Sequence, residues 1–265
     1  MKDHANGRYL TAAIVIGGIV GTYFFSRPKK KGVKTALDHK KQKKVDRNLV
    51  TPANATFGIV WSTIYAGTIA LAVHQALPSE RQNPRYKKAQ PWLRLNYILS
   101  GVFGYFFSKS DKTSRIGAAI TTISMLPAAI GLHQALEIGQ TEVKGPENIL
   151  RKFISLYTGW LTAATAISLT TLVQEAGYAK APEEAKKWAL GALPVTAGLG
   201  TAAANRLNDP YYLLTLIAAL TGIAVKQKDS NTEISILAGT LSTYLIGVFQ
   251  KKLKEEQDYL KTGNI

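Results

Sequence analysis

Charged residues are excluded from eight long stretches of this chain, and this exclusion constrains the fold more than any other feature of the sequence. All 33 Lys and Arg and all 17 Asp and Glu lie outside these stretches. The stretches are residues 9–26, 48–79, 95–108, 116–136, 153–174, 188–205, 210–225 and 234–250. A surface helix of a soluble protein keeps one polar face, whereas a helix of roughly 20 residues that crosses a bilayer is apolar all round. The pattern therefore predicts an all-α, polytopic transmembrane helical bundle with about eight spans.

The predicted spans are rich in Gly, Ala, Ser and Thr. Small residues allow helix backbones to approach each other closely inside a membrane. The sixth span has such residues at Gly191, Ala197, Gly198, Gly200, Ala203 and Ala204. We therefore expect this span to pack closely on another helix through these positions, either within the chain or in a partner subunit.

A strongly basic segment, residues 27–47, separates the first two spans and contains ten Lys or Arg and two Asp. Basic loops stay on the inner side of a membrane, so with eight spans both termini are expected on the opposite side from this loop. Basic residues at a membrane surface contact anionic lipid headgroups. Because the segment has no Phe, Trp or Tyr to stack on bases, we expect no nucleic-acid partner.

Residue patterns that carry catalysis are missing from the sequence. The chain has no cysteine, which excludes thiol nucleophiles and cysteine metal sites, and none of the eight charge-free stretches contains a carboxylate. The common hydrolase, phosphate-loop and dinucleotide motifs are also missing. The polar side chains of the predicted bundle are hydroxyls, amides and indoles, which orient a ligand rather than transform it. We expect a protein that is not an enzyme, with no catalytic residue, no metal site and no required cofactor.

The four residues His-Gln-Ala-Leu occur twice, at 74–77 and 133–136, where they close the second and fourth spans. Histidine is a usual ligand of porphyrin iron, so His74 and His133 are one candidate pair of ligands. The alternative, and the more common role, is a histidine that hydrogen-bonds headgroups or water at the membrane interface.

Two segments carry an unusual pattern of aromatic and small residues. Residues 52–65 read PANATFGIVWSTIY, and residues 157–168 read YTGWLTAATAIS. These segments resemble the second and fifth spans of the tryptophan-rich sensory protein and translocator protein family (TspO/MBR, the peripheral benzodiazepine receptor type). Those spans read P, then F-G-P-V-W-T-x-L-Y, and Y-x-x-W-x-S-x-A-T-x-L-N. A weaker match places residues 95–103 on the third span, L-N-x-x-W-S-x-x-F.

The resemblance implies a membrane protein that binds a planar lipophilic ligand, with a receptor-like role in sensing, trafficking or protection. A bound tetrapyrrole of the porphyrin type is the first ligand class, and a sterol or other lipid is the second. The implied ligand-binding residues are Pro52, Phe57, Trp61, Tyr65, Asn96, Tyr157, Trp160, Ala164 and Thr165. Ile59 in place of Pro, Leu99 in place of Trp and Ser168 in place of Asn depart from the family motifs and thin the aromatic lining.

The spacing of the aromatic residues agrees with such a site. Phe57, Trp61 and Tyr65 are four residues apart and so share one helix face, as Tyr157 and Trp160 do on the fifth span. Facing each other, these stripes would make a flat aromatic cleft, with the chain at 52–54 covering one end. From spacing alone the alternative is that the rings pack the bundle and anchor it at the interface.

The resemblance covers residues 9–174, so we divide the chain into a five-helix translocator-like unit, 1–174, and a three-span C-terminal extension with a surface tail, 175–265. The extension motivates a second hypothesis, an accessory subunit or assembly factor of a larger membrane complex, and a homodimer is a further possible assembly. A secondary transporter is less well supported, because the sequence has no convincing repeat and no charge within a span. The expected location is a bacterial inner membrane, a thylakoid membrane or an organellar membrane.

Overall fold

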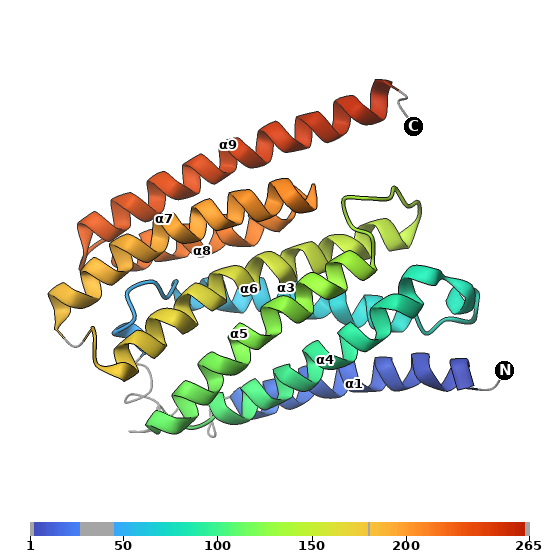
Figure 1. Cartoon of the computed structure of the whole chain (residues 1–265), viewed down its shortest axis with the longest axis horizontal. Coiled ribbons are helices and arrows are strands. Elements are labelled where there is room, and N and C mark those ends of the chain that lie inside the picture. The colour runs from blue at the N-terminus through green and yellow to red at the C-terminus, as the bar shows by residue number, and fades with distance from the viewer. Residues whose placement is uncertain (1–2, 27–44, 180, 263–265) are drawn as a thin grey trace.

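The computed structural model describes residues 3–26, 45–179 and 181–262, and within them the chain is all-helical (Figure 1). The α-helices are α1 (Asp3–Ser26), α3 (Asn54–His74), α4 (Pro84–Phe107), α5 (Lys112–Ala135), α6 (Pro146–Ala176), α7 (Pro182–Leu207), α8 (Tyr212–Gln227) and α9 (Thr232–Thr262). A short 3-10 helix, η1 (Pro78–Gln82), connects α3 to α4. Most of the basic segment, residues 27–44, lies outside the described residues.

Each charge-free stretch of the sequence corresponds to one of these α-helices, which confirms the prediction of a polytopic helical bundle. Among the described residues, five segments are long and apolar enough to cross a membrane: Gly7–Phe25, Asn54–His74, Lys112–Ala135, Pro146–Ala176 and Thr232–Glu256. The remaining three helices are α4 and α7, which carry charged residues in their first turns, and the 16-residue α8.

Side chains and prolines at the charged loops mark where the helices begin. The Asn83 side chain accepts hydrogen bonds from the backbone N–H groups of Arg85 and Tyr86 at the start of α4. Asp111 accepts one from the Ser114 N–H at the start of α5, at 2.9 Å. Such caps satisfy N–H groups that a helix leaves unpaired at its first turn. Loop residues therefore set the helix boundaries, and the apolar stretches supply the helix interiors.

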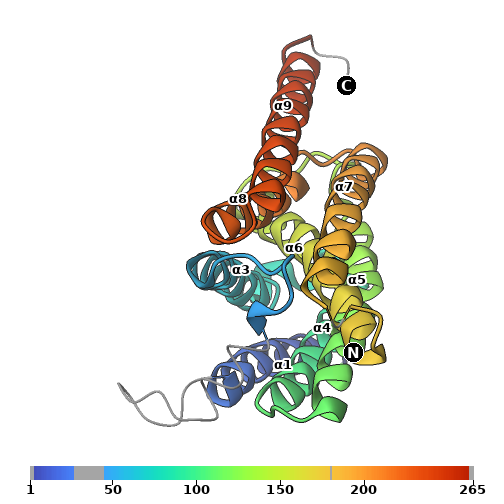
Figure 2. The ribbon, with the colours of Figure 1, turned by 90° about the vertical axis from the view of Figure 1, so that its left-hand side faces the viewer.

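Five of the helices form a closed ring, in which α1 packs on α3, α3 on α6, α6 on α5, α5 on α4 and α4 on α1. The C-terminal helices lie outside this ring: α8 packs on α6 and α3, α7 packs on α6 and α8, and α9 packs on α8 and α7. Figure 2 shows α9 and α8 on one side of α6, with α1 and α4 on the other. The start of α1 and the end of α9 lie at the same end of the bundle in Figure 1, as expected for an even number of passes.

Glycines mark the closest helix crossings. A Cβ atom at Gly18 of α1 would overlap the Tyr97 carbonyl of α4, and one at Gly159 of α6 would overlap the Tyr212 carbonyl of α8. The small residues of the sixth span, α7, do not all face a helix of this chain, because Gly191 and Gly198 have no atom within 4 Å of an added Cβ. Gly200 of the same helix does face a neighbour, the Leu216 side chain of α8. The helical register decides which of these small residues face a neighbouring helix, because positions 197, 200 and 204 share the buried face of α7 whereas position 198 is exposed.

The buried core runs without a break from the ring into the C-terminal helices. One hydrophobic cluster joins Ile64 of α3 and Trp160 of α6 to Leu193 of α7, Leu216 of α8 and Leu245 of α9. A second cluster fills the ring between α1, α3, α4, α5 and α6. The five-helix unit and the C-terminal extension thus share a core in the three-dimensional structure, and their division at residue 174 stays a prediction.

Candidate functional site

The aromatic residues predicted from the two sequence motifs meet between α3 and α6. The Trp61 ring stacks on Tyr65, with centroids 4.9 Å apart, and meets Trp160 edge to face at 6.1 Å. Phe57 also contacts Trp160 edge to face, at 5.4 Å, and Tyr157 lies 6.4 Å from Trp61. These five residues are called the aromatic cluster below. Their separations are typical of favourable aromatic pairs.

Helix α4 adds two residues to the aromatic cluster. The Tyr157 hydroxyl donates to the Asn96 side-chain oxygen at 3.1 Å, and the Asn96 amide donates to the Trp92 carbonyl at 2.8 Å. Tyr97 stacks on Tyr157 with centroids 6.0 Å apart, and its side chain is 1 % exposed. Asn96 is one of the predicted site residues, whereas Tyr97 is not among them. Tyr97 shares the buried face of α4 with Leu93 and Ser100, and this helical spacing is the sequence signal that predicts its burial.

The aromatic cluster is deeply buried on α6 and more open on α3. Trp160 and Tyr157 are fully buried, whereas Phe57, Trp61 and Tyr65 are half-buried. Among the described residues, the indole N–H of Trp160 has no hydrogen-bond partner. A buried donor without an acceptor costs roughly 1–3 kcal/mol, so this N–H is available to an acceptor that enters the site.

Pro52, Ala164 and Thr165 have different surroundings. Pro52 is buried against Gly222 of α8, and the next residue, Ala53, donates its N–H to the Gly222 carbonyl at 3.1 Å. Ala164 follows Trp160 by one helical turn and is half-buried. The Thr165 hydroxyl is buried without a partner among the described residues. The segment expected to cover one end of the cleft is therefore fastened to α8, one turn before Phe57.

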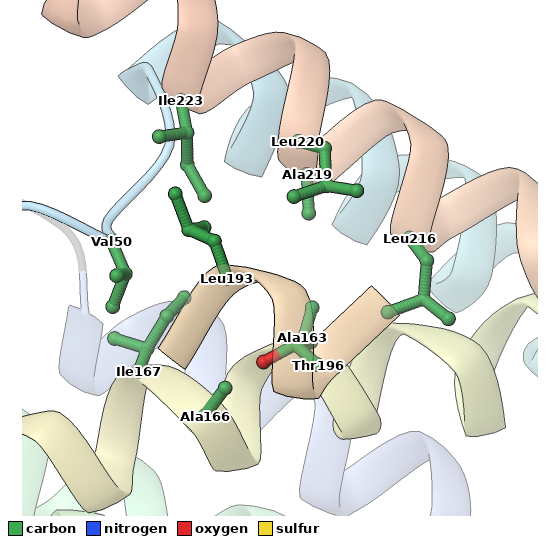
Figure 3. A pocket seen from close by; sticks show the side chains of 10 residues that line it. All are labelled: Val50, Ala163, Ala166, Ile167, Leu193, Thr196, Leu216, Ala219, Leu220 and Ile223. Atoms are coloured by element: carbon green, nitrogen blue, oxygen red, sulfur yellow. The ribbon is translucent and has the colours of Figure 1, made fainter. Parts of the chain in front are cut away.

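Two cavities in the structure lie apart from the nine predicted site residues, none of which lines either of them. The first is enclosed between α6, α7 and α8, with Val50 at one end (Figure 3). The second is an apolar groove between the end of α3 and the start of α6, lined in part by Val73, His74 and Ile149.

Both repeated histidines are engaged by neighbouring side chains. His74 Nδ1 lies 2.9 Å from the Tyr86 hydroxyl. His133 is fully buried, and its Nε2 lies 2.8 Å from Asp209 Oδ2. Within the described part of the chain, no group of three or more His, Asp or Glu is placed to hold a metal ion. These contacts support a structural role for each histidine.

Ion pairs hold the loops at the end of the bundle where α3 and α5 finish. Arg85 makes a bidentate pair with Glu147, through bonds of 2.7 and 2.9 Å. The Lys88 ammonium donates to Glu137 at 3.0 Å and holds the pKa of that carboxyl below its usual value. The Arg151 guanidinium donates to the backbone carbonyls of Thr141 and Glu137. These bonds hold the loop between α5 and α6 against the first turns of α4 and α6.

The chain matches one family model among known proteins. The model is described as TSPO-like protein and matches residues 10–250, a range that includes α7, α8 and most of α9. No curated protein and no solved structure matches the chain.

Proposed function

This chain belongs to the TSPO-like protein family, whose model spans residues 10–250, and from that premise we propose that it binds a planar lipophilic ligand at the aromatic cluster. The chain is a multi-pass membrane protein. The proposed ligand is a tetrapyrrole of the porphyrin type, with a sterol or other lipid as the second class. The proposed role is sensing, trafficking or protection in a bacterial inner, thylakoid or organellar membrane.

One observation carries the proposal: the Trp160 ring contacts two rings of the facing helix, Phe57 and Trp61, and its buried indole N–H has no hydrogen-bond partner among the described residues. Planar ligands gain most from aromatic faces and edges, and a few polar groups then fix their orientation. A tetrapyrrole has flat π surfaces for the rings and carbonyl or carboxylate oxygens that accept from the indole. A sterol has the flat shape but offers a single hydroxyl.

Access to the aromatic cluster requires its rings to separate. Phe57, Trp61 and Tyr65 lie on α3 and are half-buried, whereas Trp160 and Tyr157 are fixed in the core. Separating an aromatic pair costs about 0.5–1.5 kcal/mol in addition to the free energy of exposing its apolar surface. A bound π system replaces the lost ring contacts with new ones. The ligand is thus expected to enter by displacing the side chains of α3.

The polar groups of the site favour binding over catalysis. They are the Trp160 indole, the Tyr157 and Tyr65 hydroxyls and the Asn96 amide. None of them is a carboxylate, an amine or an imidazole, which are the usual proton-transfer groups of enzymes. The site is therefore proposed to bind its ligand without converting it.

A porphyrin titration tests the proposal. Protoporphyrin IX is added to the purified protein in nanodiscs, and binding is followed by the porphyrin absorption band, which does not depend on the number of tryptophans. Trp160→Phe keeps a ring but removes the N–H, and loss of one such hydrogen bond is expected to weaken binding about five- to tenfold. Trp188→Phe, at a tryptophan 45 % exposed on α7, is the control and should leave the affinity unchanged. Equal affinity of both variants and the wild-type protein would overturn the site assignment.

One observation favours the second function, a subunit of a larger complex. Gly191 and Gly198 of α7 have open space beside them, and the neighbouring Val195 and Leu199 are 59 % and 62 % exposed. This outer face is smooth enough for another helix to approach closely. Native mass spectrometry from nanodiscs tests it: a complex that Gly198→Leu dissociates would support this function, and a monomer would argue against it.

A further inference from the structure

The groove between the last turns of α3 and the first turns of α6 is open to the outside of the bundle. It is lined by Ala70, Val73, His74 and Leu77 of α3 and its C-terminal end, and by Pro146, Ile149 and Leu150 of α6. Val73, Leu77 and Ile149 are 48 %, 42 % and 62 % exposed, so these side chains form part of the outer surface. The volume of the groove is about 480 Å³, which is in the range of small-molecule sites. It is called the α3–α6 groove below.

The α3–α6 groove lies where the membrane-spanning part of α3 ends. Its lining positions between 70 and 77 are three and four residues apart, so they form one stripe along the helix, about 10 Å long. The charge-free stretch that contains α3 ends just beyond this stripe, and the next charged residue is Glu80. Acyl chains surround a spanning helix, and lipid headgroups lie where its charged residues begin. An occupant therefore has hydrocarbon along the stripe and its polar end near Glu80.

The lining favours an acyl chain over a ring system. Among the residues that line the α3–α6 groove, His74 alone is polar or aromatic. Branched side chains such as Val73 and Ile149, beside the small Ala70, make an uneven apolar floor. A flexible acyl chain follows such a floor, whereas a flat, rigid ligand gains most from aromatic faces. A tetrapyrrole or a sterol is thus a poor match.

His74 is held in one orientation by a buried partner. Its Nδ1 lies 2.9 Å from the hydroxyl oxygen of Tyr86, a residue that is 1 % exposed. A tyrosine hydroxyl that donates to Nδ1 leaves the proton of the neutral imidazole on Nε2. With this assignment, Nε2 is a hydrogen-bond donor at the polar end of the groove.

Glu80 places an acceptor opposite this donor. Its Oε1 lies 4.0 Å from His74 Nε2, which is too far for a direct hydrogen bond. Its Oε2 accepts from the Asn83 amide at 3.0 Å, and this bond holds the carboxylate in place. Both the His74 and the Glu80 side chains are partly exposed. One oxygen atom beside the gap can accept from Nε2 and donate to Oε1, as a bridging water does.

This pair of groups selects the headgroup of the lipid. A hydroxyl both accepts and donates, whereas an ammonium has no acceptor for His74. A phosphate or a carboxylate accepts from His74, but its charge is repelled by the Glu80 carboxylate. The matching occupant is an uncharged lipid with acyl chains and a single free hydroxyl.

From these features we propose that the α3–α6 groove binds a diacylglycerol, with one acyl chain along α3 and α6 and the hydroxyl between His74 and Glu80. This site is separate from the aromatic cluster, because none of the cluster residues lines the groove.

Photolabelling tests the proposal. A dioleoylglycerol probe with a diazirine in one acyl chain is added to the full chain in phosphatidylcholine nanodiscs and irradiated, and the labelled peptides are identified by mass spectrometry. Labelling is expected within residues 70–77 and 146–150, and an excess of unlabelled 1,2-dioleoylglycerol should abolish it. The methyl ether of this lipid, which lacks the free hydroxyl, and dioleoyl phosphatidic acid should each compete about tenfold less well. These competitors need no variant and so do not depend on whether a variant folds.

Three variants refine the test. Ala70→Phe places a ring in the groove from an exposed position and should reduce labelling about tenfold. Ala55→Phe, also exposed but at the other end of α3, is the matched control and should change labelling less than about twofold. Glu80→Gln removes the charge but keeps a side-chain oxygen, so phosphatidic acid should now compete nearly as well as dioleoylglycerol.

Several outcomes would overturn the proposal. Labelling that is absent from the two segments, or that does not saturate, would mean that the α3–α6 groove is ordinary lipid-facing surface. Equal competition by the methyl ether would show that the hydroxyl is not recognised, and equal competition by phosphatidic acid in the wild-type protein would show that Glu80 does not select against charge. Stronger competition by cholesterol would identify a sterol site instead. Protoporphyrin IX should not compete, so this test can fail or succeed independently of the one for the aromatic cluster.

Discussion

His133 and Asp209 form a buried hydrogen bond that ties the ring to the C-terminal helices. The two residues are 76 positions apart, their atoms Nε2 and Oδ2 are 2.8 Å apart, and their side chains are 0 % and 2 % exposed. Asp209 also accepts from the Tyr211 N–H at 3.0 Å, so it caps the turn that leads into α8. This side-chain pair helps to hold the end of α5 against the start of α8.

Removal of either member of this pair is expected to destabilise the fold. His133→Ala leaves a buried carboxylate without its partner, and an unpaired buried charge costs roughly 3–5 kcal/mol. Thermal unfolding in detergent, followed by circular dichroism, should show a clear fall in Tm for His133→Ala and for Asp209→Ala. The double variant should lose much less than the sum of the two. A simple sum would mean that the two residues do not stabilise each other.

The crossing of α6 and α8 at Gly159 is expected to tolerate no side chain. A Cβ there would overlap the Tyr212 carbonyl and approach the Thr215 hydroxyl, which donates to Leu156 of α6 at 2.9 Å. Gly159→Leu should destabilise the protein by about 1–3 kcal/mol or more, because the helices must separate. Gly198→Leu is the matched control, since its Cβ points into open space, and it should leave the Tm of the monomer within a degree or two of wild type. Equal Tm values for the two variants would contradict this view of the crossing.

The Lys88–Glu137 pair predicts a pH dependence of stability. Its effect is to lower the pKa of Glu137, so the folded protein favours the ionised carboxylate more than the unfolded chain does. The stabilisation is therefore present above the unfolded pKa, near 4.5, and is lost as pH falls through the lower folded pKa. Lys88→Gln should be less stable than wild type at pH 7, and the difference in Tm should shrink as the pH falls below about 4.5. A difference that stays constant over this range would show that the pair does not contribute.

The connections between helices are expected to alternate between the two membrane surfaces. Lys109, between α4 and α5, and Gln140, between α5 and α6, are both exposed. Because the chain has no cysteine, Lys109→Cys and Gln140→Cys each introduce a single labelling site. A membrane-impermeant maleimide should reach the two cysteines from opposite sides, with residue 109 on the side of the basic segment, the inner side. Labelling of both from one side would exclude α5 as a span.

Local sequence patterns were enough to predict the helices and half of the candidate site. The absence of charge over a span length is a property of neighbouring residues, so each of the eight helices could be recognised without knowing its partners. The spacing of four between Phe57, Trp61 and Tyr65 likewise places them on one face of α3 in any fold. Their meeting with Trp160 was expected from the family resemblance, and the structure brings these rings together.

Only the tertiary structure decided which of the glycines in the charge-free stretches face another helix. Gly159 and Gly198 both lie in charge-free stretches, yet one touches the Tyr212 carbonyl and the other has open space beside it. In a bilayer both the lipid and the protein interior are apolar, so the sequence carries no polar stripe to tell the two sides of a helix apart. The pairing of His133 with Asp209 depends on how distant helices are placed, and it cannot be read from local spacing. Sequence alone determined that the chain spans a membrane as a helical bundle, and the packing of the helices determined which residues meet between them.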